Sequence, residues 1–435
     1  MATLETERLD PSSGALEGAI PVEPVAPRRP PRFAAFDGLR AIAAATVLGV
    51  HVAFVSGLTF RNRAVGIYTA RLEIGVAVFF LISGFLLYRP FAVTNLAAGP
   101  RPRTGAFWVR RLLRIVPAYW VALFVTTSIV HLSSIGPGGW RAYLSHYLFA
   151  QIYVPGQVVK GISQAWTLCV EMSFYLFLPL YAAAVGRGRK HDLSRQRLVR
   201  ELVGLGVLVA ISLGWRFWVL ANQHGHGPFF KLMTVWLPAE FDLFGLGMLL
   251  AVLSAWSHQH GRELRWMSRW WFPWVSWMLA LAAFVGVSHI GVPTTVTFTK
   301  SDLDIARQTL YGAFGFFLLL PAVFGPDRRG AIRRFLCCWP VSALGVISYG
   351  VYLWHQTLIA ELIKYYPKLF GIRLFFNVAF WGMFWEILGA AIVVASVSYF
   401  VVEKPALRLK RLLGWFKQAS PGDDPAGVQG SASKA

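Results

Sequence analysis

Residues 36–58 read FDGLRAIAAATVLGVHVAFVSGL, an apolar stretch that is long enough to cross a bilayer as one helix. A hydrocarbon core of about 30 Å takes about 20 helical residues. The whole chain of 435 residues has the same character, because 56% of it is hydrophobic and only 14% is charged. A soluble domain carries about 25% charged residues. The composition excludes a disordered, collagen-like or disulfide-framework protein and predicts a polytopic membrane protein.

Ten such apolar stretches predict an all-α bundle of about ten transmembrane helices. Their approximate boundaries are 36–58, 74–93, 116–132, 166–186, 202–221, 237–256, 271–289, 305–325, 339–361 and 374–402. Residues 140–155 are aromatic and weakly polar, which predicts an interfacial or re-entrant segment rather than a further span. The three cysteines, Cys169, Cys337 and Cys338, are too few and too apolar in setting for a metal cage, so we expect no metal site.

The basic residues predict the orientation of the chain in the membrane. Of the 42 Lys and Arg residues, 30 fall in segments on one side and 10 on the other. An excess of positive charge marks cytoplasmic loops, so we expect an inner-membrane protein with both termini in the cytoplasm. The net charge of +21 is spread over short clusters between apolar stretches. This distribution argues against a nucleic-acid partner and for the lipid bilayer as the surroundings.

The ends of the chain differ in composition from its centre. Residues 1–33 are rich in Pro, Ala and Glu and contain no apolar run that could act as a signal peptide. Residues 413–435 are predicted to form a cytoplasmic tail. The sequence therefore predicts a membrane domain over 34–412 between two tails, with all chemistry inside the helical bundle and its loops.

Arg40 and His51 are the most informative polar pair, because buried charged or titratable groups are costly in a membrane. They are eleven positions apart, which places them on one face of the first helix and about 16 Å apart along its axis. We expect Arg40 near the cytoplasmic mouth, where it could meet the phosphate of a long anionic donor. His51 would lie near mid-membrane and could act as a general base. The alternative is a packing histidine and an arginine that only anchors the topology.

Two further motifs carry candidate site residues. Arg111 and Arg114 in RRLLRIVP share a helix face, and paired guanidinium groups bind phosphate well. A basic loop that only sets topology is the alternative. Glu171, in WTLCVEMSFY, is an isolated carboxylate inside the fourth span and should be neutral or paired. It could orient His51, or it could form a structural ion pair with a nearby arginine.

The remaining polar positions are weaker candidates. Ser83 in FFLISGF is expected to assist close helix packing. Glu403 precedes Lys404 and Pro405, where a proline is expected to end the last span. Candidate acceptor or pocket residues are Asp37, Trp166, Asp242, Tyr349 and His355.

These motifs together resemble the acyltransferase 3 family of bacterial membrane O-acyltransferases. The resemblance extends from about residue 33 to 412. It is carried by six motifs in the expected order: FDGLRAIAAATVLGVH, FFLISGF, RRLLRIVP, WTLCVEMSFY, ISYGVYLWH and SYFVVEKP. Many relatives have a basic residue near the start of the sixth span, where this chain has Glu240 and Asp242. Some relatives also carry a C-terminal esterase-like domain, and the sequence leads us to expect none here.

The resemblance implies transfer of an acyl group, usually acetyl from acetyl-CoA, to a hydroxyl of a cell-envelope glycan, glycolipid or similar acceptor. Acyl-CoA would be a co-substrate, with no permanently bound cofactor. In the family pattern, His51 maps onto the catalytic base and Glu171 onto the acidic residue of the Trp-Ser/Thr-Leu-x-x-Glu motif. Arg40 belongs to the Arg-x10-His motif, and Arg111 and Arg114 map onto the arginines that engage the donor.

A transporter or flippase of an envelope glycolipid or small molecule is the alternative function. Such a protein would also have about ten spans and buried charges. Transporters often contain internal repeats with broken helices, and no convincing repeat relates the two halves of this chain. The two functions differ chemically, because only an enzyme couples release of CoA to formation of a new ester.

Overall fold

The computed structural model describes residues 33–132, 135, 138–188, 193–223, 228–260, 265–291, 301–325, 330–370 and 378–412. Every regular element in these ranges is helical, as predicted for an all-α protein. The described residues, from Phe33 onward, group into one compact unit. The predicted tails, 1–33 and 413–435, fall almost wholly outside the described residues, so the domain boundaries stay a prediction.

Ten long helices make up most of the unit. They are α1 (Ala35–Val55), α4 (Gly75–Ala97), α5 (Thr104–Phe124), α7 (Trp166–Val185), α8 (Ser194–Ala221), α10 (Phe241–Gln259), α11 (Phe272–His289), α12 (Ser301–Val323), α14 (Trp339–Phe370) and α15 (Val378–Ser398). The shorter helices are α2 (Leu58–Arg61), α3 (Arg63–Thr69), α6 (Gly139–Tyr147), α9 (Pro228–Lys231), α13 (Ala331–Leu336) and α16 (Lys404–Leu412).

Single turns connect or extend several of these helices. The 3₁₀ turns are η1 (Leu72–Ile74), η3 (Gln151–Tyr153), η4 (Ser163–Ala165), η5 (Leu232–Val235), η6 (Leu237–Glu240) and η7 (Arg265–Ser268). Two π-helical turns, η2 (Val125–Ile129) and η8 (Tyr399–Glu403), continue α5 and α15.

Eight helical segments of the described chain are long and apolar enough to cross a membrane. They are Ala35–Val55, Arg63–Ala97, Thr104–Ile129, Ser163–Val185, Ser194–Ala221, Leu237–Gln259, Phe272–His289 and Phe380–Leu409. Each overlaps one of the predicted spans. The prediction of a polytopic helical membrane protein is therefore confirmed.

The other two predicted spans, 305–325 and 339–361, coincide with α12 and α14. These helices contain 23 and 32 residues, so both are long enough to span a bilayer. They do not count among the eight because polar side chains such as Gln308 and His355 lower their mean hydropathy. Both of these side chains are buried inside the protein, where polar groups in a membrane bundle find their partners.

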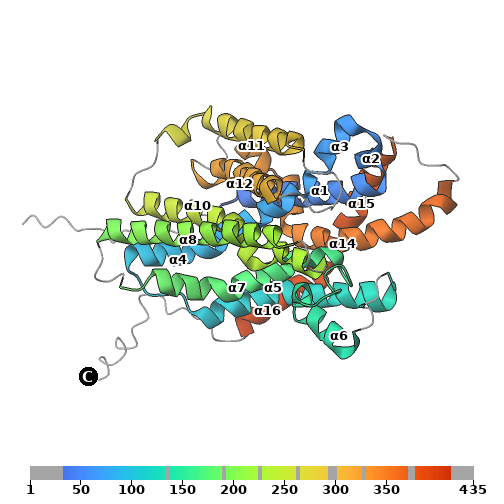
Figure 1. Cartoon of the computed structure of the whole chain (residues 1–435), viewed down its shortest axis with the longest axis horizontal. Coiled ribbons are helices and arrows are strands. Elements are labelled where there is room, and N and C mark those ends of the chain that lie inside the picture. The colour runs from blue at the N-terminus through green and yellow to red at the C-terminus, as the bar shows by residue number, and fades with distance from the viewer. Residues whose placement is uncertain are drawn as a thin grey trace, which may run out of the picture. The chain divides into compact units, whose positions relative to one another are not determined.

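The centre of the bundle is built from helices that pack at very short distances. Figure 1 shows α4, α8 and α10 lying with their axes roughly aligned, and α10 packs against both of the others. A Cβ atom on Gly84 of α4 would lie 2.3 Å from the carbonyl oxygen of Phe244, and one on Gly247 of α10 would lie 2.1 Å from that of Leu81. Only glycine permits this approach, which is typical of helix pairs in membranes.

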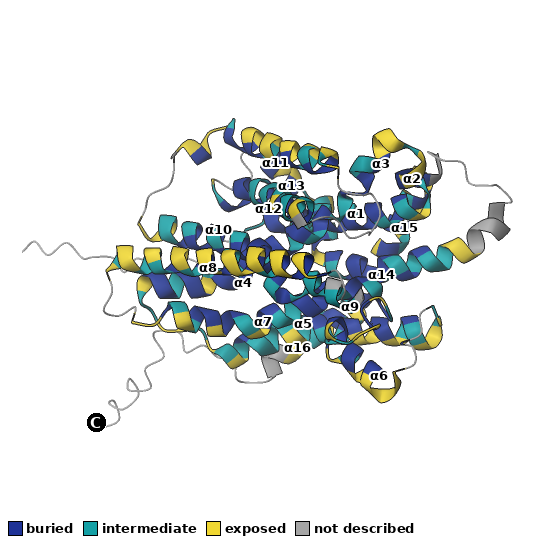
Figure 2. Cartoon of the chain, viewed as in Figure 1, coloured by how far each residue is buried: buried dark blue, intermediate teal, exposed yellow. Residues whose placement is uncertain are grey.

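Burial separates central helices from peripheral ones. Figure 2 shows broad exposed faces along α8 and α11. On α8 these faces are apolar, with Val203, Val207 and Phe217 all more than half exposed. By contrast, 78% of the residues are buried in an apolar 18-residue stretch of Leu237–Gln259, the segment that contains α10. The exposed apolar faces suit contact with lipid, and the central helices are left to hold polar groups.

Two predicted helix limits are wrong, in ways that affect the site. The third span was expected to start at residue 116, but α5 starts at Thr104, so Arg111 and Arg114 lie within the helix. Pro405 was expected to end the last span, but it lies in the first turn of α16, where a proline needs no hydrogen-bonded N–H. The loop 140–155 contains the nine-residue helix α6, which is too short to span, as predicted.

Candidate active site

A cavity lies between five helices, α1, α4, α5, α7 and α14. Elements distant in the sequence therefore contribute to one wall. Its polar and charged lining includes Arg40, Ser83, Arg111, Arg114, Glu171 and Tyr349.

Three arginines give this cavity a positive wall. Arg111 and Arg114 come from one face of α5, and Arg40 of α1 interacts electrostatically with both. The Nε atom of Arg111 is buried and has no hydrogen-bond partner among the described residues. Arg40 pairs with Asp37, whose Oδ1 lies 3.2 Å from its Nη1. Clustered guanidinium groups with unused donors are suited to binding phosphate or another anion.

Glu171 supplies a carboxylate to the same wall. One of its oxygens, Oε1, accepts hydrogen bonds from the Ser83 hydroxyl and the Tyr175 hydroxyl, both at 2.6 Å. The carboxylate also interacts electrostatically with Arg40 and Arg111. Two hydrogen bonds hold it in one orientation, and the three arginines leave the cavity with a net positive charge.

His51 lies deeper along α1, about 16 Å from Arg40 along the helix axis at the standard rise. Its ring packs against that of His355 on α14, with 5.1 Å between the ring centroids. The Nε2 atom of Gln356 lies 3.0 Å from the Nε2 atom of His51 and 3.3 Å from its Nδ1. Neither histidine lines the cavity, but Tyr352 does, and its ring centroid lies 5.8 Å from that of His355. The two histidines therefore adjoin the arginine-lined cavity.

The sequence of this chain matches a known protein family. The sequence model of a family described as an acyltransferase domain matches residues 33–403. The chain belongs to the acyltransferase 3 family. It is an enzyme that transfers acyl groups other than amino-acyl groups, as the resemblance predicted.

Curated relatives support the same assignment. The acyltransferase is 27% identical over 419 residues to "Acyltransferase MdmB" of Streptomyces mycarofaciens, which covers 92% of this chain and 97% of the relative. It is 25% identical to "Nodulation protein 10" of Rhizobium leguminosarum bv. viciae, over 78% of this chain and 83% of that one. "O-acetyltransferase OatA" of Staphylococcus aureus is 24% identical over 85% of this chain, which spans 56% of OatA. No solved structure matches.

The predicted contact between Glu171 and His51 is not formed. Glu171 bonds to Ser83 and Tyr175, and the hydrogen-bond partner of His51 is Gln356. The physical reason is depth, because Glu171 interacts with Arg40, which lies three helical turns along α1 from His51. The Glu171 carboxylate therefore lies among the arginines of the cavity wall rather than beside the histidines.

The other predicted residues occupy several places in the acyltransferase. Asp37 pairs with Arg40 beside the cavity. Tyr349 lines the cavity and donates a hydrogen bond to the carbonyl of Ile115 at 2.9 Å. His355 is almost fully buried, and its Nδ1 donates to the carbonyl of Tyr352 at 2.7 Å. Trp166 starts α7 and packs edge-on against Phe80, outside the cavity wall.

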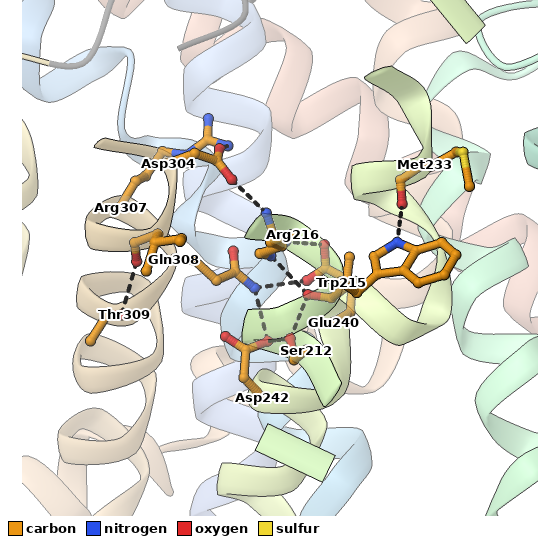
Figure 3. A network of polar contacts seen from close by, with 12 residues as sticks. Ser212, Trp215, Arg216, Met233, Glu240, Asp242, Asp304, Arg307, Gln308 and Thr309 are labelled. Atoms are coloured by element: carbon orange, nitrogen blue, oxygen red, sulfur yellow. Dashed lines mark hydrogen bonds and ion pairs between the residues drawn. The ribbon is translucent and has the colours of Figure 1, made fainter. Parts of the chain in front are cut away.

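Asp242 belongs to a separate buried network, which Figure 3 shows between α8, α10 and α12. Arg216 forms ion pairs of 2.8 Å with Glu240 and 2.9 Å with Asp304. The Oδ1 atom of Asp242 accepts hydrogen bonds from Ser212 at 3.0 Å and from Gln308 at 3.1 Å. None of these residues lines the cavity. At the acidic start of the sixth span, Glu240 thus has an arginine of the preceding helix as its ion-pair partner, and Asp242 has two neutral hydrogen-bond donors.

This network gives a prediction about stability. Arg216→Met is expected to lower the free energy of unfolding by about 3–5 kcal/mol, because it leaves the Glu240 carboxylate buried without its ion-pair partner and leaves Asp304 with Arg307 alone. Unfolding of the full-length protein in mixed micelles by increasing amounts of SDS measures the change. The matched control is Arg195→Met, an exposed arginine on the same helix, which should change stability little. Equal stability of the two variants would contradict this role for Arg216.

Sequence reasoning missed one polar residue at the site, Gln356, and assigned other roles to Ser83 and Glu403. Gln356 contacts His51, and Ser83 was expected only to pack helices but bonds to Glu171. Glu403 was expected only to end a span, yet it is buried and interacts electrostatically with Arg114. Glu403 and Ser83 both lie in motifs that the resemblance had marked, which was the available signal. Among the described residues, no three His, Cys, Asp or Glu side chains are grouped to hold a metal ion.

Proposed function

We propose that this membrane acyltransferase moves an acetyl group from acetyl-CoA to a hydroxyl of a cell-envelope glycan, glycolipid or similar acceptor. The observation that carries the proposal is one cavity with three arginines in its wall, next to a histidine pair on α1 and α14. The printed name of OatA, an O-acetyltransferase, supports acetyl as the group and oxygen as the acceptor atom.

The arginines provide the binding site for the donor. CoA carries phosphates at one end and the thioester at the other end of a flexible arm. Arg40, Arg111 and Arg114 would hold the phosphates by charge-assisted hydrogen bonds. The arm would then extend along α1 toward His51. Acetyl-CoA acts here as a co-substrate, so no cofactor needs to stay bound between turnovers.

His51 would act as the general base. A ring nitrogen takes the proton of the acceptor hydroxyl while the hydroxyl oxygen bonds to the thioester carbonyl carbon. The carbon–sulfur bond then breaks, and the leaving thiolate takes up the proton from the imidazolium. Every atom is thereby accounted for: the acceptor becomes an ester and the donor becomes free CoA. His355 is buried and His51 is partly buried, which would limit the access of bulk water that competes for the acyl group.

Glu171 would act on the donor side in this scheme. Its carboxylate is fixed by Ser83 and Tyr175 and lies close enough to Arg40 and Arg111 to orient their guanidinium groups. Tyr349, in the cavity wall, and His355, beside His51, are the proposed pocket residues for the reacting ends of donor and acceptor.

The proposed setting is the inner membrane with both termini in the cytoplasm, which the distribution of basic residues supports. Acetyl-CoA would then enter from the cytoplasmic side, where Arg40, Arg111 and Arg114 are expected. The partners of the protein are accordingly the bilayer, the acyl-CoA donor and a hydroxylated acceptor.

Isotope-labelled acetyl-CoA tests the proposal directly. The gene is deleted in the organism that encodes it, and wild type or His51→Ala is restored at equal level. Unfractionated lysates, which contain the natural acceptor, are incubated with acetyl-CoA labelled in the acetyl group. We expect mass spectrometry to find a labelled ester, with an equal amount of free CoA, only with wild type. A lysate with wild type that forms no more labelled ester than the deletion strain would overturn the proposal and favour a transporter.

A further inference from the structure

A chain of three polar side chains ends at His51. Ser163 of η4 donates a hydrogen bond to Oε1 of Gln356 on α14. The other end of the same amide, Nε2, lies 3.0 Å from Nε2 of His51 on α1. The chain joins three elements that are far apart in the sequence, and the imidazole is its last member. The three side chains are partly buried, and a polar chain of this kind fixes the direction of a ring as well as its position.

The segment that carries Ser163 is itself attached firmly to α14. Nε2 of Gln164 donates to the carbonyl oxygens of Tyr352 at 3.3 Å and Leu353 at 2.9 Å. The Tyr352 hydroxyl in turn donates to the carbonyl of Gln164 at 3.0 Å and lies 2.7 Å from the Thr167 hydroxyl. These contacts are made in the helical turn just before Gln356. They hold Ser163 at a fixed distance and orientation relative to the Gln356 amide.

We infer that Gln356, held by Ser163, is the positioning residue of His51 in acyl transfer. The inference rests on the proposed function, in which His51 is the base. A primary amide has a donor end and an acceptor end, and a serine hydroxyl can donate or accept. The amide can therefore donate to the neutral ring and, after rotating about its Cγ–Cδ bond, accept from the protonated ring. Ser163 satisfies the opposite end of the amide in both cases.

The choice of an amide has a chemical consequence. A carboxylate beside His51 would favour the protonated ring, which cannot accept a proton from the acceptor hydroxyl. An uncharged amide orients the ring without adding that charge, so the base stays ready at neutral pH. His355 is the titratable side chain whose ring packs against His51, and its Nδ1 is occupied by the Tyr352 carbonyl. Of His355 and Gln356, only Gln356 presents a hydrogen-bond donor directly to His51.

Four variants of the full-length protein test this inference. Gln356→Leu removes the contact, Gln356→Glu replaces the amide by a carboxylate, and Ser163→Ala loosens the amide. Thr357→Val is the matched control, because it removes a buried hydrogen bond of 3.1 Å to Thr126 from the same helix without touching His51. Each variant is restored in the deletion strain, and labelled ester is measured in its lysate against acetyl-CoA concentration and pH.

Gln356→Leu is expected to lower kcat by about 10- to 100-fold at unchanged KM for acetyl-CoA, the loss typical of a misplaced reacting group. Ser163→Ala should change kcat in the same direction by less. Gln356→Glu should move the ascending limb of the pH–rate profile to higher pH by about one unit or more, because a negative charge favours protonated His51. The pH–rate profile is then measured again for Gln356→Glu combined with His355→Asn. If the ascending limb keeps its shift without His355, the limb reports the titration of His51. Thr357→Val should keep the kcat and pH profile of wild type.

A second readout needs no acceptor. Nitrogen NMR of histidine-labelled protein, with the His51 signal assigned by its loss in His51→Gln, should show the ring titrating at higher pH in Gln356→Glu. If Gln356→Leu unfolds, Gln356→Glu and Ser163→Ala decide the question. An unshifted His51 titration in Gln356→Glu, or wild-type kcat in a folded Gln356→Leu, would overturn this inference. The proposed function would survive both results, and it would fail separately if His51→Ala were fully active.

Discussion

His51→Ala is expected to lower kcat for acyl transfer by about 10²- to 10⁴-fold, the contribution that a positioned general base makes. The loss should appear in kcat rather than in KM for acetyl-CoA, because in the proposed function the donor phosphates bind to Arg40, Arg111 and Arg114, which line the cavity. Labelled ester formed per unit time in lysates of the restored deletion strain gives both constants.

His51→Gln separates catalysis from packing. A glutamine side chain can still exchange hydrogen bonds with Gln356, but it cannot take up a proton near neutral pH. If His51 serves as the base, His51→Gln is as inactive as His51→Ala while the protein stays folded. If the ring only joins α1 to α14 through Gln356, His51→Gln should restore turnover, and that outcome would exclude His51 from the chemistry.

The paired arginines carry the second large effect. Arg111→Gln combined with Arg114→Gln is expected to weaken acetyl-CoA binding by about 10²-fold or more, since a hydrogen bond to a charged group contributes about 1.5–3 kcal/mol. Arg111→Lys should fall between wild type and Arg111→Gln, because lysine keeps the charge but loses the planar fork of donors. Isothermal titration of the purified full-length protein with acetyl-CoA measures the affinities.

Arg110→Gln is the matched control for this prediction. Arg110 precedes Arg111 on α5 and is not part of the cavity wall, so its loss lowers the positive charge of the helix without removing a wall residue. Affinity for acetyl-CoA should change little in this variant. A loss as large as that in Arg111→Gln would mean that the arginines act only through the general charge of the cytoplasmic face.

Helix periodicity was sufficient to predict the relations within single helices. Arg40 and His51 lie on one unbroken helix, α1, as their spacing required, and Arg111 and Arg114 share one face of α5 in the same cavity. These predictions need only the rise and rotation per residue of an α-helix. Apolar stretches in the sequence also located the ten long helices. They include α12 and α14, which do not belong to the eight segments that are long and apolar enough to cross a membrane.

Contacts between helices could not be derived in the same way. Gln356 follows His51 by 305 positions, and Glu171 follows Ser83 by 88 positions. Periodicity says which face of a helix a residue occupies, but not which other helix covers that face. The same limit applies to Arg216, whose two carboxylate partners come from η6 and α12. A buried arginine predicts that a partner exists without identifying it.

The central claim is that one site binds the donor through its arginines and transfers the acyl group through His51. Measuring acetyl-CoA affinity and turnover on the same preparation of His51→Ala, beside wild type, tests it most directly. We predict wild-type affinity for acetyl-CoA together with a loss of labelled ester of about 10²-fold or more. Wild-type turnover in His51→Ala would contradict the account.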